Sequence, residues 1–221
     1  MNLELSLKTQ NIRSFIFSET GLTSMRTKVK AAILESDDVI ILTNVQIGKN
    51  RRVLEREFLL GGKTPYEIFT NSNASESRGV LIAVKIRSNI KIIDTAKDDE
   101  DRLLLIKAVV GNETVTIGGI YDDNRNNIKT LLKLEELIDS IDGRQGLIVG
   151  GDYNVILDQK LDQFGYDTPH ARTKAVAKLK EWEESKTLTD IYRKTFKKGN
   201  MIGRILLKGE DLTNSLSQKT C

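Results

Sequence analysis

A short polar turn follows an apolar run in GLIVGGDYN. Residues 147–149 read as a buried strand, Gly150 and Gly151 let the backbone turn or a neighbour approach closely, and Asp152 and Asn154 come next. Side chains two apart on an extended chain share a face, so the carboxylate and the amide are expected to point the same way. Such a pair can bind a hard cation and hydrogen-bond a substrate oxygen. It can equally cap a turn, the commoner use of Asp and Asn after a strand.

The elements that would position this pair follow from hydrophobic periodicity. Alternating or continuous apolar runs of strand length predict strands at 2–9, 37–45, 66–72, 78–85, 90–94, twice within 103–122 around a Gly111-Asn112 turn, and at 146–152. Apolar residues at helical spacing predict helices at 22–36, 126–142 and 171–185. Trp182 is the expected core anchor of the third helix.

This order of elements indicates an α/β fold. Helices separated by many hairpin-like strands favour two packed sheets with helices outside. Two prolines, and no stretch rich in Pro, Ser or Gly, predict one domain over residues 1–200. Residues 201–221 contain one apolar cluster, Ile205–Leu207, and are expected to be a divergent or poorly ordered tail.

Amino-acid composition limits the broad class of protein to which the chain can belong, but it does not identify a function. In 221 residues, 39% hydrophobic and 29% charged side chains are typical of a globular domain rather than a disordered chain. No run approaches the ~18 apolar residues of a membrane span, and the first strand does not resemble a secretory signal. One Cys excludes a disulfide framework and favours an intracellular location, nuclear or cytoplasmic. A net charge of +3 permits a polyanionic partner without requiring one.

Five short blocks together resemble a known family. They are LSLKTQNIRSF, SRGVLIAVK, GGIYDDNRNN, GGDYNVILDQKLDQFG and LTDIYRKTF. In this order and spacing, over roughly residues 3 to 200, they resemble the endonuclease/exonuclease/phosphatase superfamily. The resemblance is strongest to the apurinic-endonuclease-like nuclease domain of non-LTR (LINE-type) retrotransposons, which nicks DNA to expose a 3′-hydroxyl for reverse transcription.

The resemblance implies a four-layer α/β sandwich that hydrolyses phosphodiesters with a divalent metal. Asp152 would orient or deprotonate the attacking water, Asn154 would hold a phosphate oxygen, and Tyr121 would donate a hydrogen bond to the phosphate or assist the leaving group. Asn11 would lie at the metal end. Mg²⁺ or Mn²⁺ suits these oxygen ligands, because no Cys or His cluster exists to favour zinc.

Two departures from the family pattern predict weak or absent nicking. Asn44 stands where the family carries a metal-binding Glu, and Mg²⁺ usually binds through one or two carboxylates, so a reduced affinity is expected. Glu19 and Asp38 are near in sequence, but nothing marks either as a replacement. The terminal Asp-His of the family has no match in residues 200–221, so the last strand of the sandwich is expected to be missing. His170, the single His, is expected to be a surface residue.

Basic residues suggest how a duplex DNA partner would be held. The candidate phosphate contacts are Arg51, Arg52, Arg125, Arg193, Lys197 and Lys198. The plain alternative is a solvated charged surface, and Asp158 and Asp162 are expected to be turn carboxylates. The chain is expected to be monomeric, with a reverse transcriptase domain as a partner in a parent element. Two other functions remain open: a catalytically inactive DNA-binding or interaction remnant of the same fold, and a small-molecule phosphoesterase.

Overall fold

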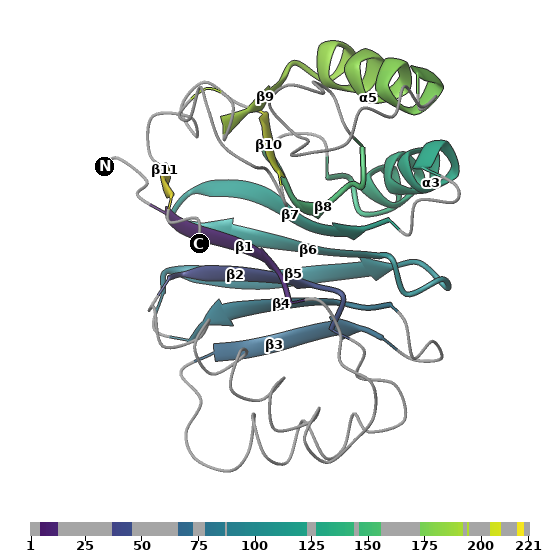
Figure 1. The fold of residues 1–221 in the computed structure, drawn as a ribbon. Coiled ribbons are helices and arrows are strands. Elements are labelled where there is room, and N and C mark those ends of the chain that lie inside the picture. The colour runs from purple at the N-terminus through teal and green to yellow at the C-terminus, as the bar shows by residue number, and fades with distance from the viewer. Residues whose placement is uncertain are drawn as a thin grey trace, which may run out of the picture.

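Two mixed β-sheets pack face to face in the computed structural model (Figure 1). The structure describes residues 5–12, 37–45, 66–72, 78–86, 88–122, 127–143, 146–155, 173–191, 194, 204–208 and 216–218. Sheet A has the strand order β11-β1-β2-β4-β3, and sheet B has the order β5-β6-β7-β8-β10-β9. The α/β class and the pair of mixed sheets are therefore as the sequence predicts.

Sheet A combines a parallel and an antiparallel half. Its strands are β1 (Leu5–Asn11), β2 (Val39–Thr43), β3 (Tyr66–Asn71), β4 (Val80–Lys85) and β11 (Leu216–Gln218). The strands β11, β1 and β2 run parallel, while β4 is antiparallel to both β2 and β3.

Sheet B is antiparallel except for one pair. Its strands are β5 (Ile90–Lys97), β6 (Leu103–Val110), β7 (Glu113–Tyr121), β8 (Gly146–Asp152), β9 (Leu188–Asp190) and β10 (Arg204–Lys208). The strands β7 and β8 run parallel, and α3 (Asn127–Ser140) connects them. After β8 the chain continues to α5 (Thr173–Ser185). Both helices fall within the predicted ranges.

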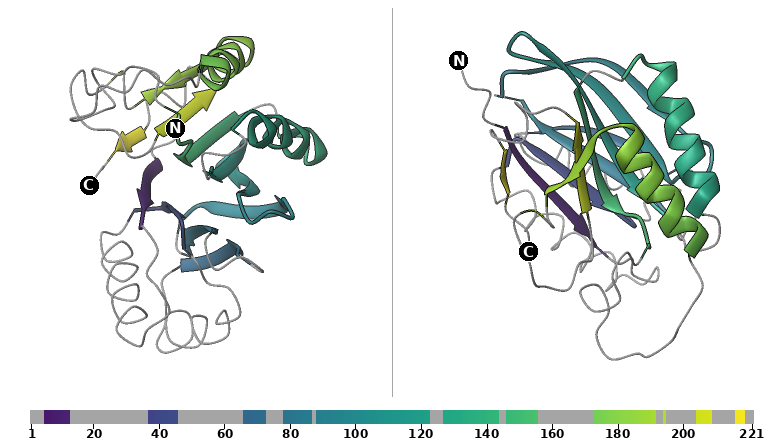
Figure 2. Two further views of the ribbon diagram at one scale, coloured as in Figure 1. Left: turned by 45° about the vertical axis from the view of Figure 1, so that its right-hand side comes forward. Right: turned by 90° about the horizontal axis from the view of Figure 1, so that it is seen from above.

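Two apolar cores hold these layers together. The inter-sheet core is formed by alternate residues of both sheets, including Leu7, Ile41, Ile82, Ile117 and Ile148. A second core lies between sheet B and the two helices, which lie side by side over that sheet (Figures 1 and 2). Trp182 is fully buried there, as predicted. The described residues thus form three layers of the expected four; the helix predicted at 22–36 lies outside them.

The C-terminal region differs from its prediction. Within residues 201–221, β10 is inserted between β8 and β9 with Ile205, Leu206 and Leu207 buried, so sheet B extends past the predicted boundary at residue 200. The sequence also predicts a missing last strand, but β11 adds a short strand beside β1. Periodicity does not indicate either strand, because β10 is short and Leu216 is the only apolar residue of β11.

Candidate functional site

One end of the sandwich gathers the strand ends that carry the predicted site residues. Asn11 is the last residue of β1, Tyr121 of β7 and Asp152 of β8, while Asn44 directly follows β2. The strands β1 and β2 are parallel, as are β7 and β8, so within each pair the carboxyl ends meet at one edge. Contact between Asn11 and Asp152 then places the two edges together.

A hydrogen bond between Asn11 and Asp152 joins the two sheets at this end. The Asn11 Nδ2 donates to Asp152 Oδ2 at 2.5 Å, across 141 positions of sequence, and both residues are half-buried. A hydrogen bond to a carboxylate is stronger than one between neutral groups. The structure therefore brings together two residues that the sequence suggested separately.

Gly151 explains why two glycines precede Asp152. Its φ is +143°, and a Cβ at this position would lie 2.0 Å from the Ile120 carbonyl oxygen on β7. Only glycine fits this close approach of the backbones. The approach keeps β8 in register with β7, so that Asp152 is paired with Tyr121.

Asn154 is placed by a turn rather than by an extended strand. Its φ is +48°, and its backbone N–H donates to Asp152 Oδ1 at 3.0 Å. Its Nδ2 donates to the backbone carbonyl of Asp122. The sequence predicts that Asp152 and Asn154 point the same way because they lie on one face of an extended chain. In the structure they are instead brought together by a turn. The turn-capping alternative describes the local geometry, and it still keeps both side chains in the site.

Tyr121 lies on the same side of sheet B as the inter-sheet core. Its ring is half-buried and packs against that core. Its backbone N–H donates to the carbonyl oxygen of Arg102 at 2.9 Å, while the next residue, Asp122, donates its N–H to the Asp152 carbonyl at 2.9 Å. The end of β7 is thus fixed by a hydrogen bond on each side.

Asn44 offers an oxygen that a cation could use. It follows Thr43, which is paired with Asn11, and its φ is +60°. Its Oδ1 is buried and has no hydrogen-bond partner among the described residues. A buried polar atom of this kind is costly unless it is satisfied.

The side chains at these strand ends include oxygen donors of the kind that suit a hard cation, but they carry little negative charge. Asp152 contributes a carboxylate, and Asn11 and Asn44 contribute amides, all of which carry the oxygen atoms that Mg²⁺ prefers. The described residues contain no group of three His, Cys, Asp or Glu able to hold a metal. Asp38 cannot supply the missing charge, because it precedes β2 at the opposite end and accepts hydrogen bonds from Ser6 N and Oγ at 3.0 and 2.8 Å.

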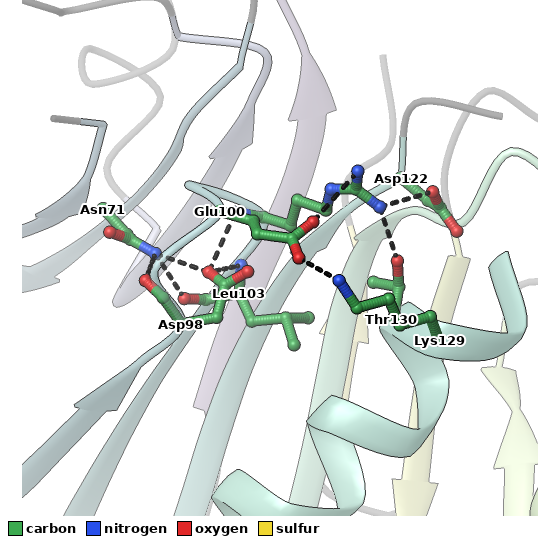
Figure 3. A network of polar contacts seen from close by, with 8 residues as sticks. Asn71, Asp98, Glu100, Leu103, Asp122, Lys129 and Thr130 are labelled. Carbon is green, nitrogen blue, oxygen red and sulfur yellow. Dashed lines mark hydrogen bonds and ion pairs between the residues drawn. The ribbon is translucent and has the colours of Figure 1, made fainter. Parts of the chain in front are cut away.

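A polar network that the sequence did not reveal borders the site (Figure 3). It contains Asn71, Asp98, Glu100, Arg102, Leu103, Asp122, Lys129 and Thr130. Burial raises the pKa of Asp98, against the lowering effect of backbone N–H groups that donate to it. The hydrogen bond from Lys129 lowers the pKa of Glu100. The available signal was the acidic run DDED directly before Arg102, but its partners are distant in sequence.

The remaining predicted residues lie outside the described residues. They are Arg51, Arg52, Arg125, Arg193, Lys197 and Lys198, together with Glu19, Asp158, Asp162 and His170. Their roles stay predictions. Among the helices that the structure describes, none is long and apolar enough to cross a membrane.

Comparison with solved structures places the molecule in a fold class. The two packed mixed sheets with flanking helices match the α/β sandwich of solved structures that include an AP endonuclease and a 3′-5′ exonuclease. No protein-family model matches the sequence, and no curated protein matches it. Three-dimensional similarity therefore carries the assignment of the fold.

Three solved structures illustrate the similarity. The 3′-5′ exonuclease NExo from Neisseria meningitidis has a TM-score of 0.63 and 17% identity, with 90% of this chain and 85% of that chain covered. The AP endonuclease LMAP from Leishmania major has a TM-score of 0.61 and 14% identity, with 95% and 79% covered. D. rerio TDP2, complexed with a single-strand DNA product, has a TM-score of 0.57 and 12% identity, with 93% and 82% covered.

Proposed function

We propose that this chain is the divalent-metal-dependent DNA endonuclease domain of a LINE-type retroelement, with nicking activity that is weakened or lost. The contact between Asn11 and Asp152 carries the proposal, since it joins residues of two separate sequence blocks at one end of the sandwich. The fold shared with an exonuclease and an AP endonuclease supports phosphodiester chemistry. The retroelement origin rests on the sequence blocks.

Each residue at this end would have a distinct task. Asp152 would orient the attacking water and take its proton, since a carboxylate offers about four acceptor positions. Asn154, whose Nδ2 donates to the Asp122 carbonyl, would hold a phosphate oxygen. The Tyr121 hydroxyl would donate to the phosphate or to the leaving oxygen. These groups are held by backbone hydrogen bonds, which favours a preorganised site.

A divalent cation would be held by Asn11, Asn44 and Asp152, and would supply charge neutralisation at the scissile phosphate. Asn44 Oδ1 is suited to this because it has no hydrogen-bond partner among the described residues. One carboxylate among three ligands supplies less charge than the family pattern would. Weak binding of Mg²⁺ or Mn²⁺, and therefore weak nicking, follows from that difference.

Duplex DNA is the proposed partner, and the fold neighbour D. rerio TDP2 binds a DNA product. A reverse transcriptase domain would use the exposed 3′-hydroxyl in a parent element. The contacts to the duplex would be phosphate contacts from the predicted basic residues, so binding should weaken as salt rises.

A plasmid-nicking assay with Mg²⁺ or Mn²⁺ tests the proposed activity. We expect slow nicking that falls about 100-fold or more in Asp152→Ala, because the variant lacks the group that activates water. Asn112→Ala, in the exposed β6–β7 turn, is the control and should leave the rate unchanged. Nicking that survives Asp152→Ala would refute the assignment of this site.

A second candidate is a DNA-binding remnant without catalysis. It is favoured by one observation: both oxygens of Asp152 already accept hydrogen bonds, from Asn11 and from the Asn154 backbone. Salt-dependent binding to duplex DNA, with no cleavage at any metal concentration, would support this function over the first. Hydrolysis of a chromogenic phosphodiester but not of DNA would instead indicate a small-molecule phosphoesterase.

A further inference from the structure

Arg102 is a buried cation beside the site and has no role in the chemistry proposed for that site. It directly precedes β6, and only 4% of the residue is exposed. Its Nη1 donates to Thr130 Oγ1 on α3 at 3.0 Å and lies 3.7 Å from Asp122 Oδ1. Its Nη2 lies 3.2 Å from Glu100 Oε2 (Figure 3). A guanidinium is rarely buried unless it is paired, so this arrangement needs an explanation.

Asp122 connects Arg102 to the site. The Asp122 residue is 1% exposed, and its carboxylate faces the guanidinium. Its N–H donates to the Asp152 carbonyl, while its own carbonyl accepts from Asn154 Nδ2. The peptide groups of Asp122 therefore contact two residues of the proposed site at once.

Arg102 also holds a third residue directly. Its backbone carbonyl accepts the N–H of Tyr121 at 2.9 Å. The Arg102 backbone thus holds Tyr121. Asp122, which faces the Arg102 side chain, holds Asp152 and Asn154. On the solvent side, Glu100 binds both Arg102 and Lys129, and this restricts the guanidinium further.

We propose that Arg102 is a positioning residue for the nuclease site, acting through Asp122 to hold Asn154 and the end of β7 in place; this inference rests on the proposed function. The planar guanidinium suits the task because its fixed donors reach Thr130 and Glu100, while Nη1 stays within ion-pair distance of Asp122. A displacement of about 1 Å at a reacting group can lower a rate about 100-fold.

A double-mutant cycle tests the coupling between Arg102 and Asp122. The variants are Arg102→Met, Asp122→Asn and their combination. Each single change should lower kcat about tenfold or more, with KM for DNA altered less than twofold, and the combined loss should be smaller than the product of the two. Asp122→Asn keeps the backbone hydrogen bonds and the side-chain volume, so it serves if Arg102→Met fails to fold.

Lys107→Met provides the matched control. Lys107 is a largely buried cation on the same strand region, with its Nζ 2.8 Å from the Ile141 carbonyl and 3.7 Å from Asp142 Oδ2. Lys107 contacts the residues that follow α3 rather than the site. The Lys107→Met substitution should lower the free energy of unfolding while leaving kcat unchanged. It therefore distinguishes the effect of losing a buried cation from the effect of losing the positioning of the site.

An NMR measurement keeps the inference separate from the proposed activity. The side-chain NH₂ signal of Asn154 and the backbone amide signals of Tyr121 and Asp122 should shift in Arg102→Met and Asp122→Asn, and stay in place in Lys107→Met. If wild type does not nick DNA, the weakened activity in the proposed function is ruled out in favour of lost activity, and these shifts still decide the positioning role of Arg102. Unchanged Asn154 signals in both site-side variants would overturn it.

Discussion

At the scale of single residues, the candidate site is notable for its amides. Asn11 donates to the one carboxylate, Asp152, through its side chain and Asn154 through its backbone N–H, while Asn44 follows β2, the neighbour of β1. An amide oxygen can coordinate a cation or accept a hydrogen bond, but it adds no charge to the site. Asn44 matters most, because its oxygen has no hydrogen-bond partner among the described residues and the resemblance places an acid at this position.

Replacing Asn44 by Asp should increase metal affinity. Asp has the same shape and tolerates the left-handed backbone that Asn44 adopts at φ +60°, unlike the longer Glu. We expect Mn²⁺ to bind about tenfold more tightly, measured by calorimetric titration. That gain is about 1.4 kcal/mol, less than the ~4 kcal/mol that two unit charges exchange at 4 Å near a protein surface.

The same variant should lose stability when metal is removed. With EDTA present, the new carboxylate would be buried without a counter-charge, so the free energy of unfolding should fall below wild type and recover with Mn²⁺. Asn112→Asp, in the exposed β6–β7 turn, should show neither effect. Equal Mn²⁺ affinity in the two variants would remove Asn44 from the metal site.

At the scale of elements, β7 brings the two sheets close together beside the site. A Cβ on Gly119 would lie 2.4 Å from Val80 Cγ1 and 3.2 Å from Ile41 Cγ2, both on sheet A. The adjacent Gly118 faces the other side, where a Cβ would lie 2.6 Å from Leu105 Cδ2. Gly119 therefore sets the spacing between the sheets near the contact of Asn11 with Asp152.

Gly119→Ala should destabilise the fold by about 1 to 3 kcal/mol, because it overpacks the inter-sheet core between two β-branched side chains. Urea unfolding measures the change. Gly118→Ala is the matched control on the same strand, and it should cost less because the end of a leucine side chain can move aside. If Gly118→Ala were the more costly of the two, the spacing of the sheets would not depend on Gly119.

The helices and strands could largely be predicted from the sequence, but the contacts between distant strands could not. Alternating or continuous apolar runs predict β1, β2, β6 and β7, and helical spacing predicts α3 and α5, because each element buries apolar side chains in a core. The pairing of β10 with β8 depends on backbone contacts between distant segments, which periodicity does not encode.

The same limit applies to the site. The short blocks indicate Asn11, Tyr121, Asp152 and Asn154, and the turn-capping alternative anticipates the turn at Asn154, but neither predicts which distant residues these side chains contact. Arg102 and Asp122 were not predicted as a pair, because a buried ion pair and a surface charge look alike in a sequence.

At the scale of the whole molecule, polar contacts between described residues join the sheets at the site end. One is the Asn11–Asp152 hydrogen bond. Another is Asn71 of sheet A, whose Nδ2 lies 2.7 Å from Asp98 Oδ1, 3.0 Å from the Asp98 carbonyl and 2.9 Å from the Leu103 carbonyl. Asp98 Oδ1 also accepts the N–H groups of Arg102 and Leu103 at 3.0 and 2.8 Å. The Asn71–Asp98 contact therefore supports the same loop that carries Arg102.

Global stability should depend on pH through Asp98. Burial raises its pKa above the ordinary value of 3.8, so above pH 3.8 the folded state binds more protons at this group than the unfolded state does. Its contribution to stability is complete below pH 3.8 and is lost as pH rises through the raised folded pKa. Other carboxylates have their own pH dependence, and Glu100, whose pKa is lowered, opposes this trend.

Comparison with Asp98→Asn isolates the effect. Asparagine keeps an oxygen that can accept from Asn71, Arg102 and Leu103, but it does not titrate. Urea unfolding of both proteins from pH 4 to 8 should show wild type losing stability relative to the variant as pH rises, since only wild type must bury a charge. A difference in stability that stays constant over this range would mean that Asp98 titrates alike in the folded and unfolded chains, and that its burial carries no charge penalty.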